Sequence, residues 1–470
     1  MTLKDNFIYN SILTVSKYLF PLIVYPYVSR TLGLSNIGIV NFIDNIVNYF
    51  VLVSMMGIMT VGVREIAAKK NNSQALSKTF VSLLALTTIG TVLAIATLWI
   101  AMYTVPKLIP YQSLLYIGII KLVFNLFLIE WFYMGMEQFK YITTRSIIVK
   151  CIYVASVFIF VREASDYTTY YFLSTLMIVA NAVINIIYSR KYIKYSLKSI
   201  SLRPYAKAFI IVGIYILFTN VYTYLNPVWL GFVTDTDQVG FFTTATKLHN
   251  IIMAVLLAFS NILFPRVSNL LAEGNKAEFW KKIDTSFDAI FLFAFPTLVF
   301  IITAGPELLH IIVGDGFEGS YIPLRIITPL VLVIGLEQIL VIQILMATHQ
   351  DSTVLRNAFF GALVAFVLNL LITSSLGAIG SAIVWLVAEL VILCLSIEAI
   401  YRQHRYLMPI GRLSRYMASY APLLLMCILV CHYMESSLVM VIAIGTLVVI
   451  YAAIVEWFVM KNKVLKLILK

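Results

Sequence analysis

Residues 7–28 read FIYNSILTVSKYLFPLIVYPYV, a run of 22 residues with a single charged side chain, Lys17. A helix of about 20 mainly apolar residues crosses the roughly 30 Å hydrocarbon core of a bilayer. The run therefore predicts a membrane-spanning helix, and Lys17 lies near its middle. Thirteen similar runs follow. The fourteen predicted spans are 7–28, 37–58, 79–103, 112–133, 142–161, 168–189, 208–231, 241–264, 286–304, 326–346, 354–373, 378–398, 416–433 and 437–459.

The composition agrees with this pattern. Of the 470 residues, 61% are hydrophobic and 12% are charged, and the mean hydropathy is +0.94. Soluble globular domains are usually nearer half apolar, so a water-soluble fold is excluded. Helices close their backbone hydrogen bonds internally, as lipid demands. We expect an all-α polytopic membrane protein with about 14 transmembrane helices.

The charges predict the topology. With the N-terminus inside, the connections on the inner side carry 26 Lys and Arg residues, whereas those on the outer side carry four. Because basic residues concentrate in cytoplasmic loops, we expect a multi-pass protein with both termini in the cytoplasm. The net charge of +12 then reflects topology and contact with anionic lipid headgroups. A nucleic-acid partner is not expected.

Short motifs recur along the chain. Residues 36–38 (Asn-Ile-Gly) correspond to residues 238–240 (Gln-Val-Gly) at an offset of 202, and residues 134–145 resemble residues 346–356 at an offset of 211 to 212. Each match places an arginine at a cytoplasmic connection, where it could form a gate or fix topology. These arginines are Arg64 with Arg266, and Arg145 with Arg356.

The matches predict two six-helix lobes related by a parallel repeat, with two extra helices at the C-terminal end. An even number of helices per lobe gives both lobes the same orientation. The predicted divisions are 1–190 for the N-lobe, 191–207 for a basic cytoplasmic linker, 208–400 for the C-lobe, and 401–470 for helices 13 and 14 with a basic tail.

Several motifs resemble a known family. Residues 25–33 (YPYVSRTLG), 57–67 (GIMTVGVREIA) and 137–140 (EQFK) are similar to those of Wzx-type polysaccharide and O-antigen flippases. These flippases belong to the multidrug/oligosaccharidyl-lipid/polysaccharide exporter superfamily. The resemblance implies a MATE-like fold and a secondary-type transporter in the bacterial cytoplasmic membrane, with no catalytic residues and no metal.

The resemblance also implies a function. We expect the chain to move undecaprenyl-diphosphate-linked oligosaccharide repeat units from the cytoplasmic to the outer leaflet by alternating access. Such transport serves O-antigen, capsule or exopolysaccharide synthesis, in which other polysaccharide assembly proteins would be partners. The repeat unit itself is not predicted.

Ionisable side chains inside spans are functional candidates, because burying one in the membrane is costly. They are Lys17, Asp44, Lys121, Glu130, Lys247, Glu337 and Glu389, with Lys150 expected nearer an interface. Ammonium groups bind phosphate as point charges, and neighbouring amides and hydroxyls can bind sugars. The predicted substrate-binding residues are Lys17, Lys121, Lys247, Asn41, Asn45, Asn48, Tyr215, Thr219, Tyr222 and Asn250. The alternative is that the lysines pair with acids and hold helices together.

No phosphate-binding loop of the ATPase type occurs in the sequence, and no cofactor is expected. A proton or sodium gradient would then drive transport, with Asp44, Glu337 and Glu389 as ion-coupling candidates. Two other functions stay open: an ion-coupled multidrug exporter of the same fold, and a membrane glycosyltransferase or polymerase. The lysines disfavour the first, and the short outward loops disfavour the second.

Overall fold

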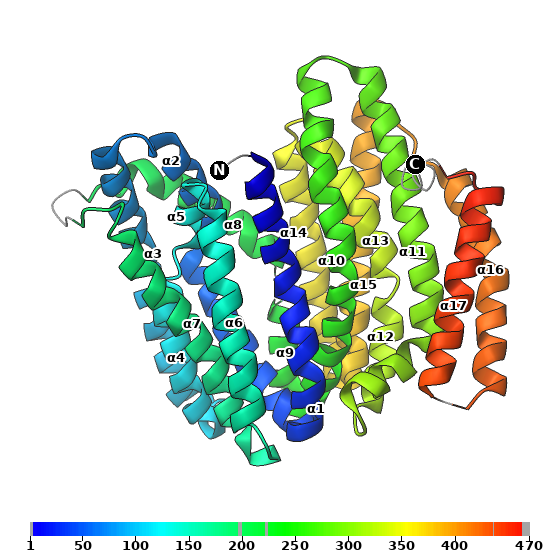
Figure 1. Cartoon of the computed structure of the whole chain (residues 1–470), viewed down its shortest axis with the longest axis horizontal. Coiled ribbons are helices and arrows are strands. Elements are labelled where there is room, and N and C mark those ends of the chain that lie inside the picture. The colour runs from blue at the N-terminus through cyan, green and yellow to red at the C-terminus, as the bar shows by residue number, and fades with distance from the viewer. Residues whose placement is uncertain (1–2, 196–199, 221–223, 436, 463–470) are drawn as a thin grey trace. The chain divides into compact units, whose positions relative to one another are not determined.

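A computed structural model describes residues 3–195, 200–220, 224–435 and 437–462, which form helices and contain no strand. The predicted all-α polytopic fold is confirmed. The chain divides into two compact units, Met1–Val239 (unit 1) and Gly240–Lys470 (unit 2). Long helices run side by side within each unit (Figure 1). The lobe boundaries at 190 and 208 stay a prediction.

Unit 1 contains the first nine α-helices and the start of the tenth. They are α1 (Leu3–Met55), α2 (Ile58–Lys69), α3 (Ser73–Thr104), α4 (Gln112–Asn125), α5 (Glu130–Gly135), α6 (Phe139–Phe160), α7 (Tyr167–Ser189), α8 (Arg203–Asn220), α9 (Asn226–Val233) and α10 (Thr236–Ala272). A buried aromatic cluster around Phe80, Trp131 and Phe132 packs α3 against α5.

Unit 2 continues from α10. Its further elements are α11 (Lys276–Val313), α12 (Tyr321–Ile327), α13 (Leu330–Glu337), a π-helix (Gln338–Met346), α14 (Asp351–Leu368), a π-helix (Asn369–Thr373), α15 (Ser374–His404), α16 (Ile410–Tyr433), α17 (Leu438–Ile454) and a last π-helix (Val455–Val459).

Ten stretches of the described residues are long and apolar enough to cross a membrane. Two of them, 11–69 and 351–404, contain a non-helical glycine and include two predicted spans each. In the second, hydrogen bonds join Gln350 to His404 and Asn357 to Ser396, positions almost equidistant from Gly377. This pairing makes α14 and α15 an antiparallel hairpin. The ten stretches thus include twelve of the fourteen predicted spans. The other two, 208–231 and 241–264, correspond to α8–α9 and to α10, which include positions outside the described set.

Two predicted spans are interrupted. The span 112–133 consists of α4 and α5, separated by a turn in which Ile129 has a φ of 37°. The span 326–346 contains the end of α12, all of α13 and the π-helix Gln338–Met346, and the helix is interrupted near Pro329, whose ring removes a backbone donor. Hydrophobic length alone predicted the membrane crossing in each case, but not the break.

The connections between the helices of unit 1 lie in two groups, one at each end of the unit, and contacts hold each group together. At one end, Ser35 donates to Asp237 and Lys107 donates to the carbonyl of Thr234. At the other end, Lys70 pairs with Glu137 at 2.8 Å. The connections assigned to the outer side by the charge pattern therefore lie together, and so do those assigned to the inner side.

The part of α1 before Gly33 lies parallel to α6. Thr143 donates to the carbonyl of Tyr9, Lys150 to Ser16, and Tyr27 to the carbonyl of Val161. All three contacts have a sequence separation of 134 residues. A constant separation over 18 residues of α1 means that the helices run in the same direction and in register.

Hydrogen bonds and an ion pair join α16 and the end of α17 to α11. Buried Glu456 accepts hydrogen bonds from Tyr416 and Tyr420 at 2.9 and 3.0 Å, and Arg412 pairs with Asp288 on α11 at 2.9 Å. Asn462 bridges Glu456 and the backbone of Asp288. A satisfied buried network of this kind specifies one packing arrangement. The last two helices are therefore packed against α11 within unit 2.

Gly33 is the position that allows α1 to fold back. Its φ and ψ are 74° and 171°, a region that almost only glycine occupies, at a cost of about 1–3 kcal/mol for other residues. A Cβ atom there would meet no heavy atom within 4 Å, so Gly33→Ala tests the backbone alone. We expect it to lower the free energy of unfolding in detergent by about 1–3 kcal/mol. Gly411→Ala, with equal space in helical backbone, is the control; an equal loss in both would contradict the argument.

Candidate functional site

Two lysines lie next to each other in the middle of unit 1. Nζ of Lys150 on α6 donates to Ser16 on α1 at 2.9 Å and lies 5.5 Å from the ring centre of Phe20. Lys17 follows Ser16 and is close enough to Lys150 for the two ammonium groups to repel each other. Among the described residues, neither lysine forms an ion pair with a carboxylate. Two like charges at mid-span form a site that favours an anion.

Lys150 was expected nearer an interface, and that expectation is wrong. The residue lies in the middle of α6, which begins at Phe139 and ends at Phe160. The midpoint of the predicted span 142–161 already lies between residues 151 and 152, so the bounds of the helix were correct and only the depth assigned to Lys150 was wrong. The structure thus adds Lys150 to the candidate site.

Lys17 faces away from the apolar surface of α1. Its side chain is exposed, while Val15 and Leu19, two positions before and after it, are 60% and 48% exposed. Residues two positions apart point to opposite sides of a helix. The exposed apolar residues are suited to lipid, so Lys17 lies on the face where a polar environment is expected.

The polar stripe in the second half of α1 contacts α4. Nζ of Lys121, a buried residue, lies 2.5 Å from Oδ1 of Asp44 and 2.7 Å from Oδ1 of Asn48. Asn48 in turn donates to Asp44 at 3.0 Å, and Asn45 donates to the carbonyl of Asn41. The charge of Lys121 is therefore balanced within unit 1, which is the structural alternative that the sequence left open.

A buried tyrosine of α7 lies beside Asp44. The hydroxyl of Tyr171 is close enough to the Asp44 carboxylate to interact with it. A Cβ atom on Gly118 of α4 would lie 3.3 Å from this hydroxyl, so the glycine makes room for it. The sequence gave no signal for Tyr171, because its role depends on the packing of α7 against α4.

Unit 2 holds a pair of buried acids. Glu337 on α13 and Glu389 on α15 are 8% and 4% exposed and lie close enough for their carboxyl groups to interact. Trp385 donates to Glu389 at 3.1 Å. Two buried carboxylates that share a site repel each other and lose their hydration, so ionising both is costly. The pair is thus suited to holding a proton.

His249 on α10 belongs to the same cluster. It is 1% exposed and its ring centre lies 5.3 Å from that of Trp385. Its Nε2 has no hydrogen-bond partner among the described residues. The sequence analysis did not select His249, although it lies in a predicted span two residues after Lys247, and an ionisable residue at that depth was the available signal.

The remaining candidates are placed as follows. Lys247 is half-buried and Asn250 is exposed, both on α10. Arg64 is exposed beside Glu65, Arg145 is buried between Glu130 and Asn185, and exposed Arg356 donates to Asn357. Tyr222 and the side chains of Tyr215, Thr219 and Arg266 lie outside the described residues.

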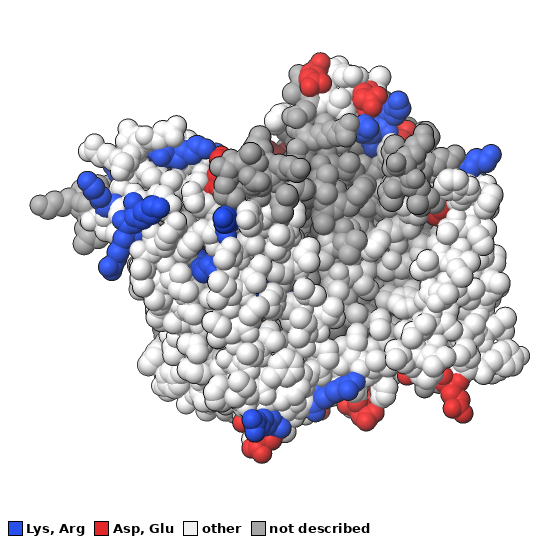
Figure 2. Space-filling model, viewed as in Figure 1, with Lys and Arg blue, Asp and Glu red and all other residues white. Residues whose placement is uncertain are grey.

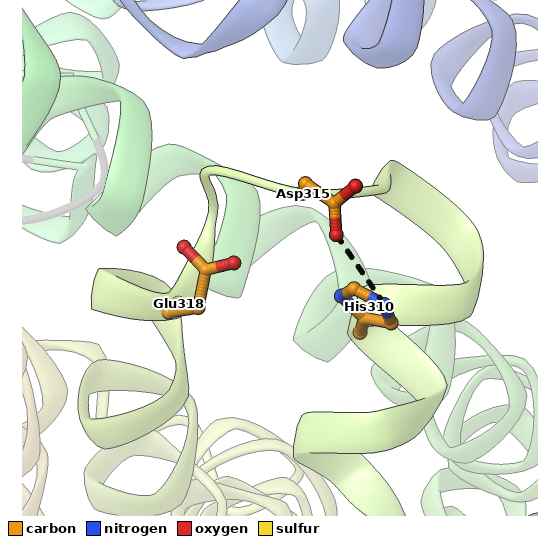
Figure 3. Close-up of side chains that lie close together, drawn as sticks. All are labelled: His310, Asp315 and Glu318. Carbon is orange, nitrogen blue, oxygen red and sulfur yellow. Dashed lines mark ion pairs between the residues drawn. The ribbon is translucent and has the colours of Figure 1, made fainter. Parts of the chain in front are cut away.

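A turn at the end of α11 brings His310, Asp315 and Glu318 together (Figure 3). Nε2 of His310 lies 3.6 Å from Asp315, and Glu318 accepts the backbone N–H of Gly316 at 3.0 Å. The three ligand atoms lie within 4.8 Å of one another. Asp315 is 96% exposed, and exposed ion pairs contribute little to stability. The group is best explained as shaping the turn.

Comparisons with known proteins give a family and a fold. The model of a family described as "Polysaccharide biosynthesis protein" matches residues 3–271. A protein of Escherichia coli (strain K12), named "Putative O-antigen transporter", is 25% identical over 83% of this chain and 94% of its own length. A protein of Shigella dysenteriae with the same name is 26% identical over 85% of this chain and 100% of its own.

Solved structures share the fold. The structure titled "Lipid II flippase MurJ, inward closed conformation" has a TM-score of 0.77 at 15% identity and covers 95% of this chain and 98% of that chain. An inward-facing multidrug resistance MATE family transporter of the MOP superfamily has a TM-score of 0.64 at 16% identity, with 82% and 95% covered. At these identities the likeness shows the fold alone.

Proposed function

Because the chain belongs to the polysaccharide biosynthesis protein family, we propose that it is a Wzx-type flippase for a lipid-linked oligosaccharide. The carrier that we propose is undecaprenyl diphosphate. The substrate would enter from the cytoplasmic leaflet of the bacterial inner membrane and leave from the outer leaflet. On this proposal the chain performs transport rather than catalysis.

The pair formed by Lys17 and Lys150 is the observation that carries this proposal. A diphosphate bears at least two negative charges, and two adjacent ammonium groups match them. Asp44 pairs with Lys121 and Glu130 with Arg145, so each of these two acids has a cation other than Lys17 and Lys150 as its ion-pair partner. A site for lipophilic cations would need the opposite sign. The amides of Asn41, Asn45 and Asn48 are proposed to bind sugar hydroxyls.

Substrate binding tests this assignment. Purified protein in detergent is titrated with an undecaprenyl-diphosphate oligosaccharide, with undecaprenyl monophosphate and with ethidium, a lipophilic cation. We expect the diphosphate to bind best, because it makes more contacts with the two ammonium groups than the monophosphate does. Saturable binding of ethidium without binding of the diphosphate would support the multidrug exporter instead. Hydrolysis or extension of the oligosaccharide would support an enzyme.

We further propose that the pair of Glu337 and Glu389 couples transport to a proton gradient. The pair is suited to holding a proton while the two carboxyl groups lie close together, and moving α13 relative to α15 would change its affinity for that proton. Asp44 is a weaker candidate, because Lys121 already balances its charge. Sodium is the competing ion.

Glu389→Gln should remove the dependence of the transport rate on pH. An amide cannot exchange a proton in this range, so a rate that changes between pH 5.5 and pH 8 in the wild type should become flat. The assay is transport in vesicles at equal pH on both sides and again with a pH gradient. Glu456→Gln, at an acid whose oxygens accept bonds from two tyrosines, is the control. Wild-type pH dependence in Glu389→Gln and in Glu337→Gln would exclude the pair.

A further inference from the structure

A groove opens between α6 and α7 at the end of unit 1 that the charge pattern assigns to the cytoplasm. Its volume is about 520 Å³, and Lys140, Tyr141, Arg145, Ile148 and Ile184 are among the residues that line it. Figure 2 shows that lysines and arginines gather along the edge of unit 1 where α6 begins and α7 ends. The groove is separate from the contact between Lys17 and Lys150.

The mouth of the groove is polar and carries positive charge. Lys140 is exposed, and Arg145 is 5% exposed. Two nitrogens of Arg145 bind Glu130 and Asn185, while Nε has no hydrogen-bond partner among the described residues. Glu130 neutralises one of the two cations. The mouth therefore keeps one net positive charge and one buried donor that lacks an acceptor.

The groove becomes apolar toward the middle of the membrane. Ile148 and Ile184 line it and are 55% and 40% exposed. Ile152 lies one turn further along α6 toward the middle of the membrane and is 62% exposed. The rings of Tyr141 and Tyr188, stacked with their centres 4.0 Å apart, also line the groove. A phospholipid has the same order of groups, with a phosphate at the interface and a chain beyond it.

Unit 2 contains a groove at the corresponding place, between α14 and α15, with a volume of about 600 Å³. Four of its lining residues lie 211 positions after lining residues of the first groove. The pairs are Arg145 with Arg356, Val149 with Phe360, Ile184 with Leu395, and Tyr188 with Ala399. The match agrees with the predicted repeat, because an offset of 211 was found from the sequence for the two arginines.

The second groove differs in that a carboxylate belongs to its lining. Glu398 lies in its lining and pairs with Arg402 at 2.5 Å, so a carboxylate is present where an anion would bind. No acid lines the first groove among the residues described for it. The two grooves thus share a shape, but the first is better suited to a negatively charged ligand.

We propose that the groove between α6 and α7 binds an anionic phospholipid of the surrounding bilayer. The phosphate lies at Lys140 with Nε of Arg145 behind it, and one acyl chain follows Ile148 and Ile184. Basic pockets between helices on the cytoplasmic side are suited to anionic headgroups, and each cation there contributes about 1 kcal/mol. This inference does not depend on the proposed flippase function.

Native mass spectrometry of the full chain in detergent tests the proposal. The probes are phosphatidylglycerol and phosphatidylcholine with the same acyl chains. We expect tighter binding of phosphatidylglycerol, and Lys140→Gln should weaken it about fivefold, the equivalent of about 1 kcal/mol. Phosphatidylcholine binding should not change. Lys78→Gln removes one exposed charge at the same end of unit 1 but outside the groove, and should have no effect.

Other results would overturn the proposal. Equal weakening by Lys78→Gln would mean that diffuse surface charge attracts the lipid. Equal binding of both headgroups would exclude an anion site, and competition by glycerol phosphate alone would make it a site for soluble phosphate. Ile184→Trp, which fills the apolar part without changing charge, should reduce the binding of both lipids. If lipid binding by that variant were unchanged, the acyl chain of the lipid would not lie in this groove.

Discussion

Lys17→Ala is expected to lower the rate of lipid-diphosphate oligosaccharide translocation by about 10- to 100-fold. A hydrogen bond to a charged group contributes about 1.5–3 kcal/mol, and about 1.4 kcal/mol corresponds to a factor of ten. The variant should bind substrate more weakly without losing stability, because Lys17 is exposed and forms no ion pair within the described residues. The measurement is transport in vesicles, with folding checked by size-exclusion chromatography.

The matched variants separate charge from other effects. Lys150→Ala should give a loss of similar size, because Lys150 lies beside Lys17. Lys17→Arg keeps the charge and should retain most of the rate, whereas Lys78→Ala removes a charge elsewhere in unit 1 and should change little. If Lys17→Ala and Lys150→Ala each transported at the wild-type rate, neither lysine would bind substrate and both would have a structural role.

Lys121→Ala is expected to lower the free energy of unfolding by about 3 kcal/mol. Removing one partner of a buried ion pair leaves the other uncompensated, at a cost of about 3–5 kcal/mol. The lower end applies because the Asp44 side chain keeps 32% of its exposure and water screens part of its charge. The measurement is denaturant unfolding in detergent micelles, followed by tryptophan fluorescence.

A double variant provides the control. Lys121→Met combined with Asp44→Asn removes both charges, so it should be far more stable than Lys121→Ala. If Lys121→Ala is as stable as the wild type but binds the lipid diphosphate at least tenfold more weakly, then Lys121 binds substrate and the pairing with Asp44 is not its main role. That result would support the substrate-binding role predicted from the sequence.

Most of the fold could be predicted from the sequence because lipid imposes simple rules. Hydrophobic length gives the spans, and the distribution of Lys and Arg predicts which connections share an end, as the contacts of Ser35 with Asp237 and Lys70 with Glu137 illustrate. The breaks near Ile129 and Pro329 were not predicted. Each is a local backbone event inside a run that stays apolar throughout.

The candidate site could be predicted only as a set of residues. Lys17, Lys121 and Glu389 were selected because ionisable groups in spans are costly, but their partners come from other helices. Lys121 meets Asp44 across 77 residues of sequence. The sequence places three lysines and four acids inside spans, and this count does not say which lysines are paired. The structure pairs Lys121 with Asp44 and leaves Lys17 beside Lys150.

The most direct test is the movement of a labelled undecaprenyl-diphosphate oligosaccharide across vesicles that contain the purified chain. Accessibility of the label to an added reagent reports the leaflet. The account predicts translocation well above that of protein-free vesicles, and a return to that background when Lys17→Ala and Lys150→Ala are combined. Binding without any translocation by the wild type, with or without a proton gradient, would contradict the flippase assignment.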